Sequence, residues 1–307
     1  MAAKKPSPVA WREGLSRAGT YRDAFTFDPE RIKHPSAGWV EMFKDEFGMT
    51  DADFARPNTQ GDDPVELDDR PGADPAHRAA LVQIVGEDNV EDSDFARVRY
   101  GHGKTVDENL ALRAGRVEAL PDLVVHPRDK QDVAAIVAYC AEHRLPLIPY
   151  GAGSGTVLGT RADRGGVVLV MRTHMNQLLS INERNMTATV QPGLIGSDFE
   201  ALLNEAPTRF GTNRAFTCGH FPQSFEMASV GGWIAALGSG QASTYYGDAY
   251  DLVISQEYVT PVGTIRTKDV PASATGPKVN DILKGSEGTF GVLVEATVKI
   301  FRYQPEN

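Results

Sequence analysis

The sequence predicts an α+β fold on three observations. After residue 120, short apolar segments with the composition of β-strands alternate with segments whose apolar residues recur at helical spacing. Two pairs of these strands are separated by short turn sequences, which predicts two hairpins. The last strand, residues 291–300, is rich in β-branched side chains that favour a sheet. Helices interleaved with hairpins indicate α+β rather than a purely doubly wound parallel sheet.

The first 116 residues differ in composition from the rest of the chain. Residues 38–47 have apolar side chains at helical spacing and predict a short amphipathic helix. Residues 51–75 are rich in Asp, Pro and Gly, which predicts an acidic, solvated linker. We therefore expect residues 1–116 to form an N-terminal extension that wraps or flanks a main domain at 117–307.

The main domain begins with a predicted strand at 123–125, followed by a helix for which Asp129 is the expected N-cap. Ser197 is the expected cap of a later helix, after the first hairpin. The apolar face of the first helix is formed by Val133, Ile136, Val137 and Cys140. Further strands are predicted at 147–149, 166–171, 178–181, 186–190, 252–254, 258–260, 264–266 and 291–300.

Length and composition restrict the class of protein. A chain of 307 residues exceeds the usual size of one hydrophobic core, so two or more packed units are expected. The formal net charge of -10 disfavours nucleic acid and anionic membrane surfaces as partners. No apolar run approaches the roughly 20 residues of a membrane-spanning helix, and no apolar segment of a secretory signal follows the basic N-terminus, so a cytoplasmic location is expected. Cys140 and Cys218 are the two cysteines, and their unrelated contexts predict neither a disulfide framework nor a metal site.

A glycine-rich loop directly after the 147–149 strand is the first chemical signal. Alternate glycines at 151, 153 and 155 permit positive φ angles and a close approach of backbone to a ligand. Successive amides turned inward form a nest that binds a diphosphate, although the same sequence also suits a tight surface turn. A Rossmann fingerprint is excluded because Thr156 stands in place of its third glycine and no helix opens there, and a P-loop is excluded because no Lys-Ser/Thr pair follows.

Two later segments share the glycine-rich, apolar character. Residues 217–247 contain too much glycine for a core element and too many apolar residues for a linker, which is typical of a segment that lies flat against a large planar ligand. Ser229 is expected to cap a short helix that begins at Val230. In residues 284–292, glycines surround Thr289 and predict a tight turn before the last strand. The alternative for residues 217–247 is an active-site loop without a cofactor, and the alternative for residues 284–292 is a simple strand-entry turn.

These segments, in this order, resemble the FAD-linked oxidases of the vanillyl-alcohol oxidase and p-cresol methylhydroxylase superfamily, and within it the alkyldihydroxyacetone-phosphate synthases (alkylglycerone-phosphate synthases). The resemblance implies a FAD-binding domain of two α/β subdomains, at about 117–178 and 179–307, with FAD between them. Upstream, Arg97-Val98 and His102-Gly103 match more loosely. The motifs that carry the resemblance are Leu120-Pro121-Asp122, Ile148-Pro149-x-Gly151-x-Gly153, Gly219-His220-x-Pro222-x-Ser224, Val230-Gly231-Gly232-Trp233, Ser239-Gly240, Tyr246-Gly247, Val259-Thr260-Pro261, Thr275-Gly276-Pro277 and Gly285-Ser286-Glu287-Gly288-Thr289-x-Gly291-Val292.

The resemblance implies three groups of cofactor-binding residues. The FAD diphosphate would be bound by Pro149, Tyr150, Gly151, Ala152, Gly153, Ser154 and Gly155. The dinucleotide and the flavin ring would be lined by Gln223, Ser224, Phe225, Glu226, Met227, Ala228, Ser229, Ala236, Leu237, Gly238 and Ser239. The adenine side would be completed by Glu287, Gly288, Thr289, Phe290, Gly291, Val292 and Leu293.

His220 falls on a histidine that the synthases place in their active site, which implies that it orients a substrate phosphate or assists proton transfer. Alternatively, it is a structural histidine that bonds a loop carbonyl. The sequence departs from the synthases at Phe221 and Gln223, where acidic residues are usual, and at 241–244, where paired lysines are missing. These departures bear on the phosphate substrate more than on the flavin. No histidine lies within 151–160, so FAD is expected to be non-covalent there.

Three functional hypotheses follow from the resemblance. The first is a FAD-dependent flavoenzyme of the oxidoreductase type, or a synthase-like transferase, in which FAD is the reactive group. The second is a FAD-dependent 2-hydroxyacid dehydrogenase or oxidase. The third is a FAD-binding fragment without independent catalysis, because the family's substrate-binding cap would follow residue 307. The expected partners are a small-molecule substrate (a hydroxy acid or a dihydroxyacetone-phosphate ester), peripheral contact with a lipid substrate, and a second copy in a homodimer.

Overall fold

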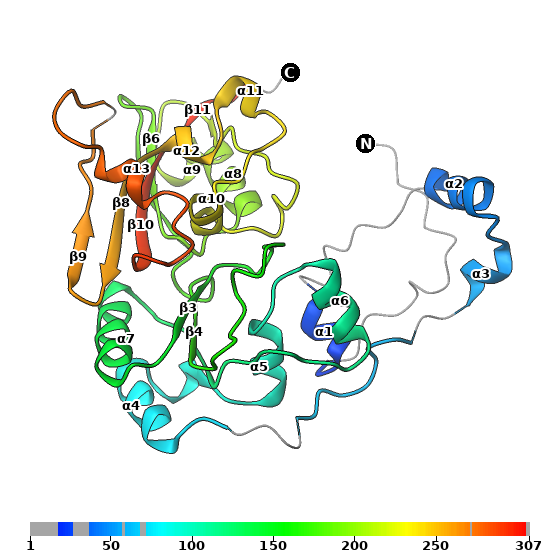
Figure 1. The fold of residues 1–307 in the computed structure, drawn as a ribbon. Coiled ribbons are helices and arrows are strands. Elements are labelled where there is room, and N and C mark those ends of the chain that lie inside the picture. Colours follow the sequence, from blue (N-terminus) through cyan, green and yellow to red (C-terminus); the bar gives the residue numbers. More distant parts are fainter. Residues whose placement is uncertain (1–17, 27–36, 57–58, 68–71, 271, 305–307) are drawn as a thin grey trace.

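The computed structural model describes residues 18–26, 37–56, 59–67, 72–270 and 272–304. Two β-sheets form the body of the protein, with helices packed on them and between them (Figure 1). The strands of the first sheet come from residues 90–170 and those of the second from residues 178–299. The predicted α+β class is confirmed.

The first sheet is mainly parallel and has the strand order β1-β2-β4-β3. β2, β4 and β3 run parallel, while β1 pairs antiparallel with β2. Helix α7 (Lys130–His143) connects β2 with β3, which lie on either side of β4, and Asp129 caps it as predicted, accepting from the amides of Gln131 and Asp132. The strands are β1 (Val90–Glu91), β2 (Leu123–Val125), β3 (Leu147–Tyr150) and β4 (Val167–Val170).

The second sheet is antiparallel throughout and has the order β5-β6-β10-β8-β9. Both predicted hairpins are present as β5–β6 and β8–β9, and the last long strand, β10, lies at the centre of the sheet. A separate two-stranded ribbon pairs β7 (Phe216–Thr217) with β11 (Phe301–Arg302). The strands of the sheet are β5 (Leu178–Asn182), β6 (Thr187–Val190), β8 (Val253–Thr260), β9 (Gly263–Arg266) and β10 (Val292–Lys299).

Short helices accompany the second sheet. The predicted cap at Ser197 is wrong, because the helix already begins at Gly196 after Ile195, which forms a bridge with Ser229. Ser229 itself caps α10 as predicted, since its hydroxyl accepts from the amide of Gly232. The helices are α8 (Gly196–Asn204), α9 (Ala206–Arg209), α10 (Val230–Ala236), α11 (Ser243–Tyr246), α12 (Ala249–Leu252) and α13 (Val279–Leu283).

Helix α7 joins the two sheets into one body. One continuous core contains its residues Val133 and Ile136 together with Val167 of the first sheet and Val292 of the second. At the first turn of α7, the ammonium group of Lys130 lies 3.3 Å from the carboxylate of Glu257 and 3.4 Å from that of Glu295, on β8 and β10. The two sheets are therefore fixed relative to each other on either side of any ligand bound between them.

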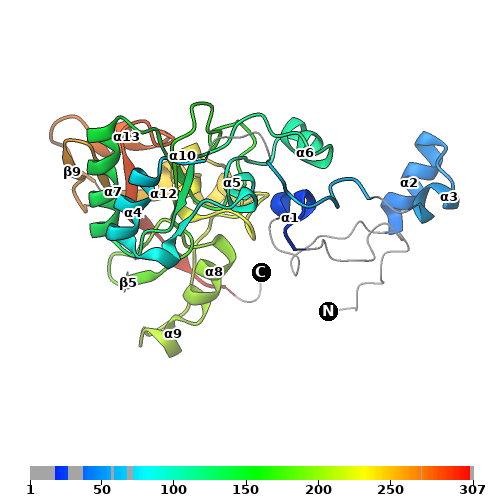
Figure 2. The same cartoon turned by 90° about the horizontal axis from the view of Figure 1, so that it is seen from below.

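The N-terminal part of the chain is helical. α4 packs against the first sheet and leads through a 3-10 turn into its strand β1, whereas α2 and α3 pack on each other at a distance from the body (Figures 1 and 2). Within the predicted linker, Asp51–Ala55 form α3. The predicted boundary between residues 116 and 117 stays a prediction. The elements are α1 (Tyr21–Phe25), α2 (Ala37–Phe47), α3 (Asp51–Ala55), α4 (Pro75–Val85), the 3-10 turn (Glu87–Asn89), α5 (Asp94–Tyr100) and α6 (Val106–Arg113).

Candidate functional site

The glycine-rich loop opens at the carboxyl end of β3, the edge at which open α/β sheets bind their ligands. Within the described ranges, the five amides of residues 151–155 donate no hydrogen bond to another part of the chain. Buried or half-buried amides need an acceptor, and Ala152 and Gly153 are buried. The loop thus presents a row of donors of the kind that binds a diphosphate.

Gly153 cannot be replaced by a residue with a side chain without local rearrangement. Its φ is +69°, in the left-handed region that favours glycine, and a Cβ built there would overlap the hydroxyl of Tyr150. Tyr150 is itself buried, and its ring meets that of Tyr100 edge-on at 5.3 Å. Tyr150, at the end of β3, therefore packs against the loop.

The second glycine-rich segment meets this loop at the start of α10. A Cβ on Gly151 would overlap Ser229 Oγ and would lie 3.8 Å from the amide nitrogen of Gly232. Ser229 is buried, and its hydroxyl is the cap of α10. The first turn of α10 and the loop after β3 are therefore in direct contact, although they are far apart in sequence.

The third segment closes the site from the other side. The amide of Glu287 donates to the carbonyl of Ala235 at 3.3 Å, and that of Gly285 donates to Ile234 at 3.0 Å. A Cβ on Gly288 would lie 3.1 Å from the ring of Pro149. The structure thus brings together the three segments that the sequence singled out.

The residues of the second segment differ in exposure. Residues 224–227 form a turn in which the amide of Met227 donates to the carbonyl of Ser224 at 2.7 Å. Phe225 stacks on Trp233 with ring centroids 6.1 Å apart. Gln223, Glu226, Ala236 and Ser239 are exposed, whereas Ala228 and Ser229 are buried. Of the third segment, Glu287, Thr289 and Phe290 are exposed, while Val292 and Leu293 already belong to β10.

His220 lies beneath the second segment. It is 1% exposed, its ring packs edge-on against Trp233 at 4.7 Å, and within the described ranges neither ring nitrogen has a hydrogen-bond partner. Burial lowers its pKa to about 4, against an opposing effect of the Asp248 carboxylate, so the ring is neutral near pH 7. A Cβ on Gly238 would lie 4.0 Å from His220 Nε2, which puts the histidine directly behind a predicted flavin-lining residue.

The sequence did not identify the contribution of the α5–α6 segment. The amide of Lys104 donates to the carbonyl of Gly155 at 2.7 Å, and a Cβ on Gly103 would lie 2.5 Å from that same oxygen. The loose match at His102-Gly103 was the one available signal. Burial lowers the pKa of Lys104 to about 8, with the positive charge of Arg99 adding to the effect.

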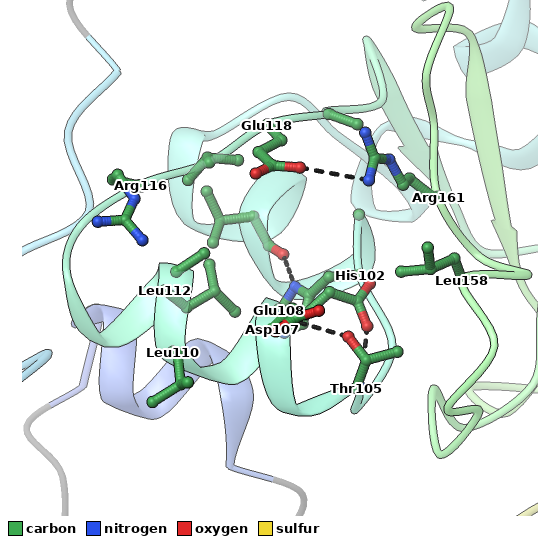
Figure 3. A pocket seen from close by; sticks show the side chains of 15 residues that line it. His102, Thr105, Asp107, Glu108, Leu110, Leu112, Arg116, Glu118, Leu158 and Arg161 are labelled. Carbon is green, nitrogen blue, oxygen red and sulfur yellow. Dashed lines mark hydrogen bonds and ion pairs between the residues drawn. The ribbon is translucent and has the colours of Figure 1, made fainter.

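A cavity of about 470 Å³ is lined by residues of α5, of α6 and of the turn between them, together with residues 116–119, Leu158 and Arg161 (Figure 3). Apolar side chains such as Leu112 and Leu158 line much of it, and Arg161 pairs with Glu118 at 3.3 Å at its edge. His102 borders it, with Nδ1 donating to the carbonyl of Val98 at 2.5 Å. Burial lowers the pKa of His102 to about 3, so its ring is neutral.

The described ranges hold no group of three or more His, Cys, Asp or Glu side chains that could bind a metal ion. Within the same ranges, no helix has both the length and the apolar character needed to cross a membrane.

Comparison with known proteins shows a FAD-binding domain in this chain. The family model described as "FAD binding domain" matches residues 121–268. An alkyldihydroxyacetonephosphate synthase of Caenorhabditis elegans is 34% identical over 233 residues, covering 74% of this chain and 38% of the synthase. The glycolate oxidase subunit GlcD of Bacillus subtilis (strain 168) is 34% identical over 226 residues, covering 72% of this chain and 43% of that protein. The chain thus spans less than half the length of these relatives.

Solved structures agree with the sequence relatives. A structure of an alkyldihydroxyacetonephosphate synthase superimposes with a TM-score of 0.70 at 30% identity, covering 78% of this chain and 42% of the other. p-Cresol methylhydroxylase superimposes with a TM-score of 0.60 at 20% identity over 75% of this chain and 44% of the other, which demonstrates a shared fold.

Proposed function

We propose that this chain is the cofactor-binding part of a flavoenzyme similar to alkyldihydroxyacetonephosphate synthase, because it carries a FAD-binding domain at residues 121–268 and shares its fold with that synthase and with p-cresol methylhydroxylase. The observation that carries the proposal is the row of amides at 151–155, without acceptors in the described chain, where three glycine-rich segments meet. Charge-assisted bonds from such amides to phosphate oxygens contribute about 1.5–3 kcal/mol each. Backbone donors alone therefore suffice to hold the diphosphate tightly, without a dedicated cationic side chain.

Each segment has its own proposed task. Residues 149–155 bind the diphosphate of FAD, residues 223–229 and 236–239 line the dinucleotide and the flavin ring, and residues 287–293 complete the adenine side. When bound, FAD would supply the reactive flavin ring, whether as a hydride acceptor or as the group that bonds the substrate. The chain contributes the position of that ring and the water-poor surface beneath it, at buried residues such as Ala228 and Trp233.

The visible absorption spectrum of the purified protein tests this proposal. Flavin bands are expected before acid precipitation, and they should move to the supernatant afterwards, because no side chain within 151–160 can form the histidyl link. A colourless protein that takes up no added FAD would contradict the proposal. Bands that stay with the precipitate would contradict its non-covalent part.

His220 is the proposed catalytic residue. Its neutral imidazole close to Gly238 supports a role next to the flavin ring, and within the described chain its two ring nitrogens have no hydrogen-bond partner. The His220→Ala variant should then retain FAD and lose turnover. Full activity in this variant would assign the ring a structural role against Trp233.

A 2-hydroxyacid dehydrogenase or oxidase is the second candidate function. It is supported by the equal identity of the glycolate oxidase subunit and by the departures from the synthases at Phe221 and Gln223. It requires that the full-length enzyme bleach its flavin anaerobically with a hydroxy acid, and a broad panel without bleaching would remove it. A third candidate, a module active only with a partner, is contradicted if the 307-residue chain alone turns over substrate.

The proposed substrate is a small molecule, either a hydroxy acid or a dihydroxyacetone-phosphate ester. The relatives named above support the general kind and not the choice between the two. A homodimer, peripheral contact with a lipid substrate and a cytoplasmic location stay predictions.

A further inference from the structure

The turn before α6 is held by one carboxylate, that of Glu108. Glu108 Oε1 accepts from the amide of Gly103 at 2.9 Å, and Oε2 accepts from the amide of Thr105 at 3.0 Å. In return, the Thr105 hydroxyl accepts from the amide of Glu108 at 3.1 Å. The Thr105 and Glu108 bonds make a capping box, in which a helix N-terminus satisfies its own free amides. The bond to Gly103 is additional.

That additional bond distinguishes α6 from the other capping boxes of the described chain. At α3, Asp53 Oδ2 accepts both bonds from Thr50, and at α12, Asp251 Oδ2 accepts from the amide of Asp248. In both cases the second carboxylate oxygen holds no residue upstream of the cap. Glu108 instead uses its second oxygen to fix a residue two positions before the cap, outside the helix.

The fixed residue lies against the diphosphate loop. Gly103 is buried, a Cβ added to it would overlap the carbonyl of Gly155, and the amide of Lys104 donates to that carbonyl at 2.7 Å. The Glu108 carboxylate thus accepts hydrogen bonds from Gly103 and Thr105, the residues on either side of Lys104, and thereby fixes the orientation of the Lys104 amide. The carbonyl of Gly155, the last residue of the diphosphate loop, is thereby held in place.

We propose that Glu108 is a positioning residue for FAD: through Gly103 and Lys104 it fixes the carbonyl of Gly155, the last residue of the diphosphate loop, without itself belonging to that loop. The inference rests on the proposed FAD function. It adds a residue outside the matched family region, which begins at residue 121. The Glu108 carboxylate also acts on the Lys104 side chain, since its negative charge partly opposes the lowering of the Lys104 pKa by burial.

The test is the FAD dissociation constant of the full chain, measured by titrating apoprotein with FAD. Glu108→Gln keeps the size of the side chain but leaves one oxygen for two amides, so it should weaken FAD binding about tenfold, the equivalent of one lost hydrogen bond of about 1.4 kcal/mol. Two controls separate positioning from helix stability. Thr105→Ala removes the return bond to the Glu108 amide and keeps both carboxylate bonds, while Asp53→Asn weakens the remote cap of α3.

Both controls should lower the melting temperature of the apoprotein and leave the FAD dissociation constant within about twofold. The inference is overturned if Glu108→Gln also stays within twofold, or if Thr105→Ala weakens FAD as much as Glu108→Gln does. If Glu108→Gln does not fold, Glu108→Asp replaces it, because a carboxylate shortened by one methylene cannot reach both amides. Wild-type protein that binds no FAD would refute the proposed function itself, a result distinct from either outcome.

Discussion

The contact between Gly151 and Ser229 lets the assembly of the cofactor site be tested by a double-mutant cycle. An alanine at 151 would place its Cβ on Ser229 Oγ, whereas the next atoms, Ser229 Cβ and the Gly232 nitrogen, lie at the ordinary distances of 3.5 and 3.8 Å. The conflict is thus with one oxygen atom. Removing that oxygen by Ser229→Ala should make room for the methyl group.

The magnitudes follow from the two roles of Ser229 Oγ. Gly151→Ala alone overpacks a closed contact, which costs about 1–3 kcal/mol of unfolding free energy. Ser229→Ala alone loses the cap of α10, whose hydrogen bond to Gly232 is 3.2 Å long, and costs about 1 kcal/mol. In the double variant the overlap is gone, and alanine at 151 also restricts the unfolded chain, a gain of about 0.4–1 kcal/mol. The double variant should therefore be no less stable than Ser229→Ala, a coupling of roughly 1–3 kcal/mol.

Urea denaturation of the four apoproteins measures this coupling without the contribution of bound FAD. Equal slopes of free energy against urea are needed, so that the midpoints report stability alone. Costs that add to within about 0.5 kcal/mol would refute the reasoning, because residues that share an atom-to-atom contact do not behave independently. Such a result would mean that the loop after β3 does not rest on α10.

Three further predictions concern other parts of the molecule. Gly153→Ala should destabilise the apoprotein by about 1–3 kcal/mol, because residue 153 has a positive φ and its Cβ would overlap the Tyr150 hydroxyl. Gly155→Ala has open space around its Cβ, so the apoprotein should keep its stability but lose flavin on gel filtration. Flavin retention equal to that of the wild type in Gly155→Ala would contradict a diphosphate at that position. Burial lowers the pKa of His220 from 6.5 to about 4, so the unfolded state takes up a proton at a higher pH than the folded state does. Between about pH 6.5 and pH 4 the free energy of unfolding should therefore fall by about 3 kcal/mol more in the wild type than in His220→Phe. The midpoints of urea denaturation measure this difference. Lys130→Met leaves the Glu257 carboxylate, which is 11% exposed, without its nearest cation, and thermal unfolding should show a loss of about 1–2 kcal/mol in stability. An unfolding temperature equal to that of the wild type at both low and high salt would contradict this prediction.

The sequence revealed the components of the site better than their arrangement. The glycines at 151, 153 and 288 can be recognised in the sequence as positions that need a residue without a Cβ. The structure shows which neighbouring atoms a Cβ would meet there. The contacts between the segments depend on how the two sheets pack on α7, which no local pattern encodes. Glu108 escaped notice because its spacing from Thr105 is that of any helix cap.

Three residues other than glycine adopt left-handed backbone conformations around the site: Leu158 at φ 65°, Leu237 at φ 50° and Glu287 at φ 46°. Each costs about 1–2 kcal/mol relative to the right-handed conformation, so surrounding contacts must hold it there. The contacts are visible: Leu237 ends α10 and covers Gly285, and Glu287 donates to Ala235 while its carboxylate lies close to Gly159. A chain selected for stability alone would place glycine or asparagine at such positions. Leu237 and Glu287 lie where the second and third segments meet, so the contacts between these two segments offset the strain of both residues.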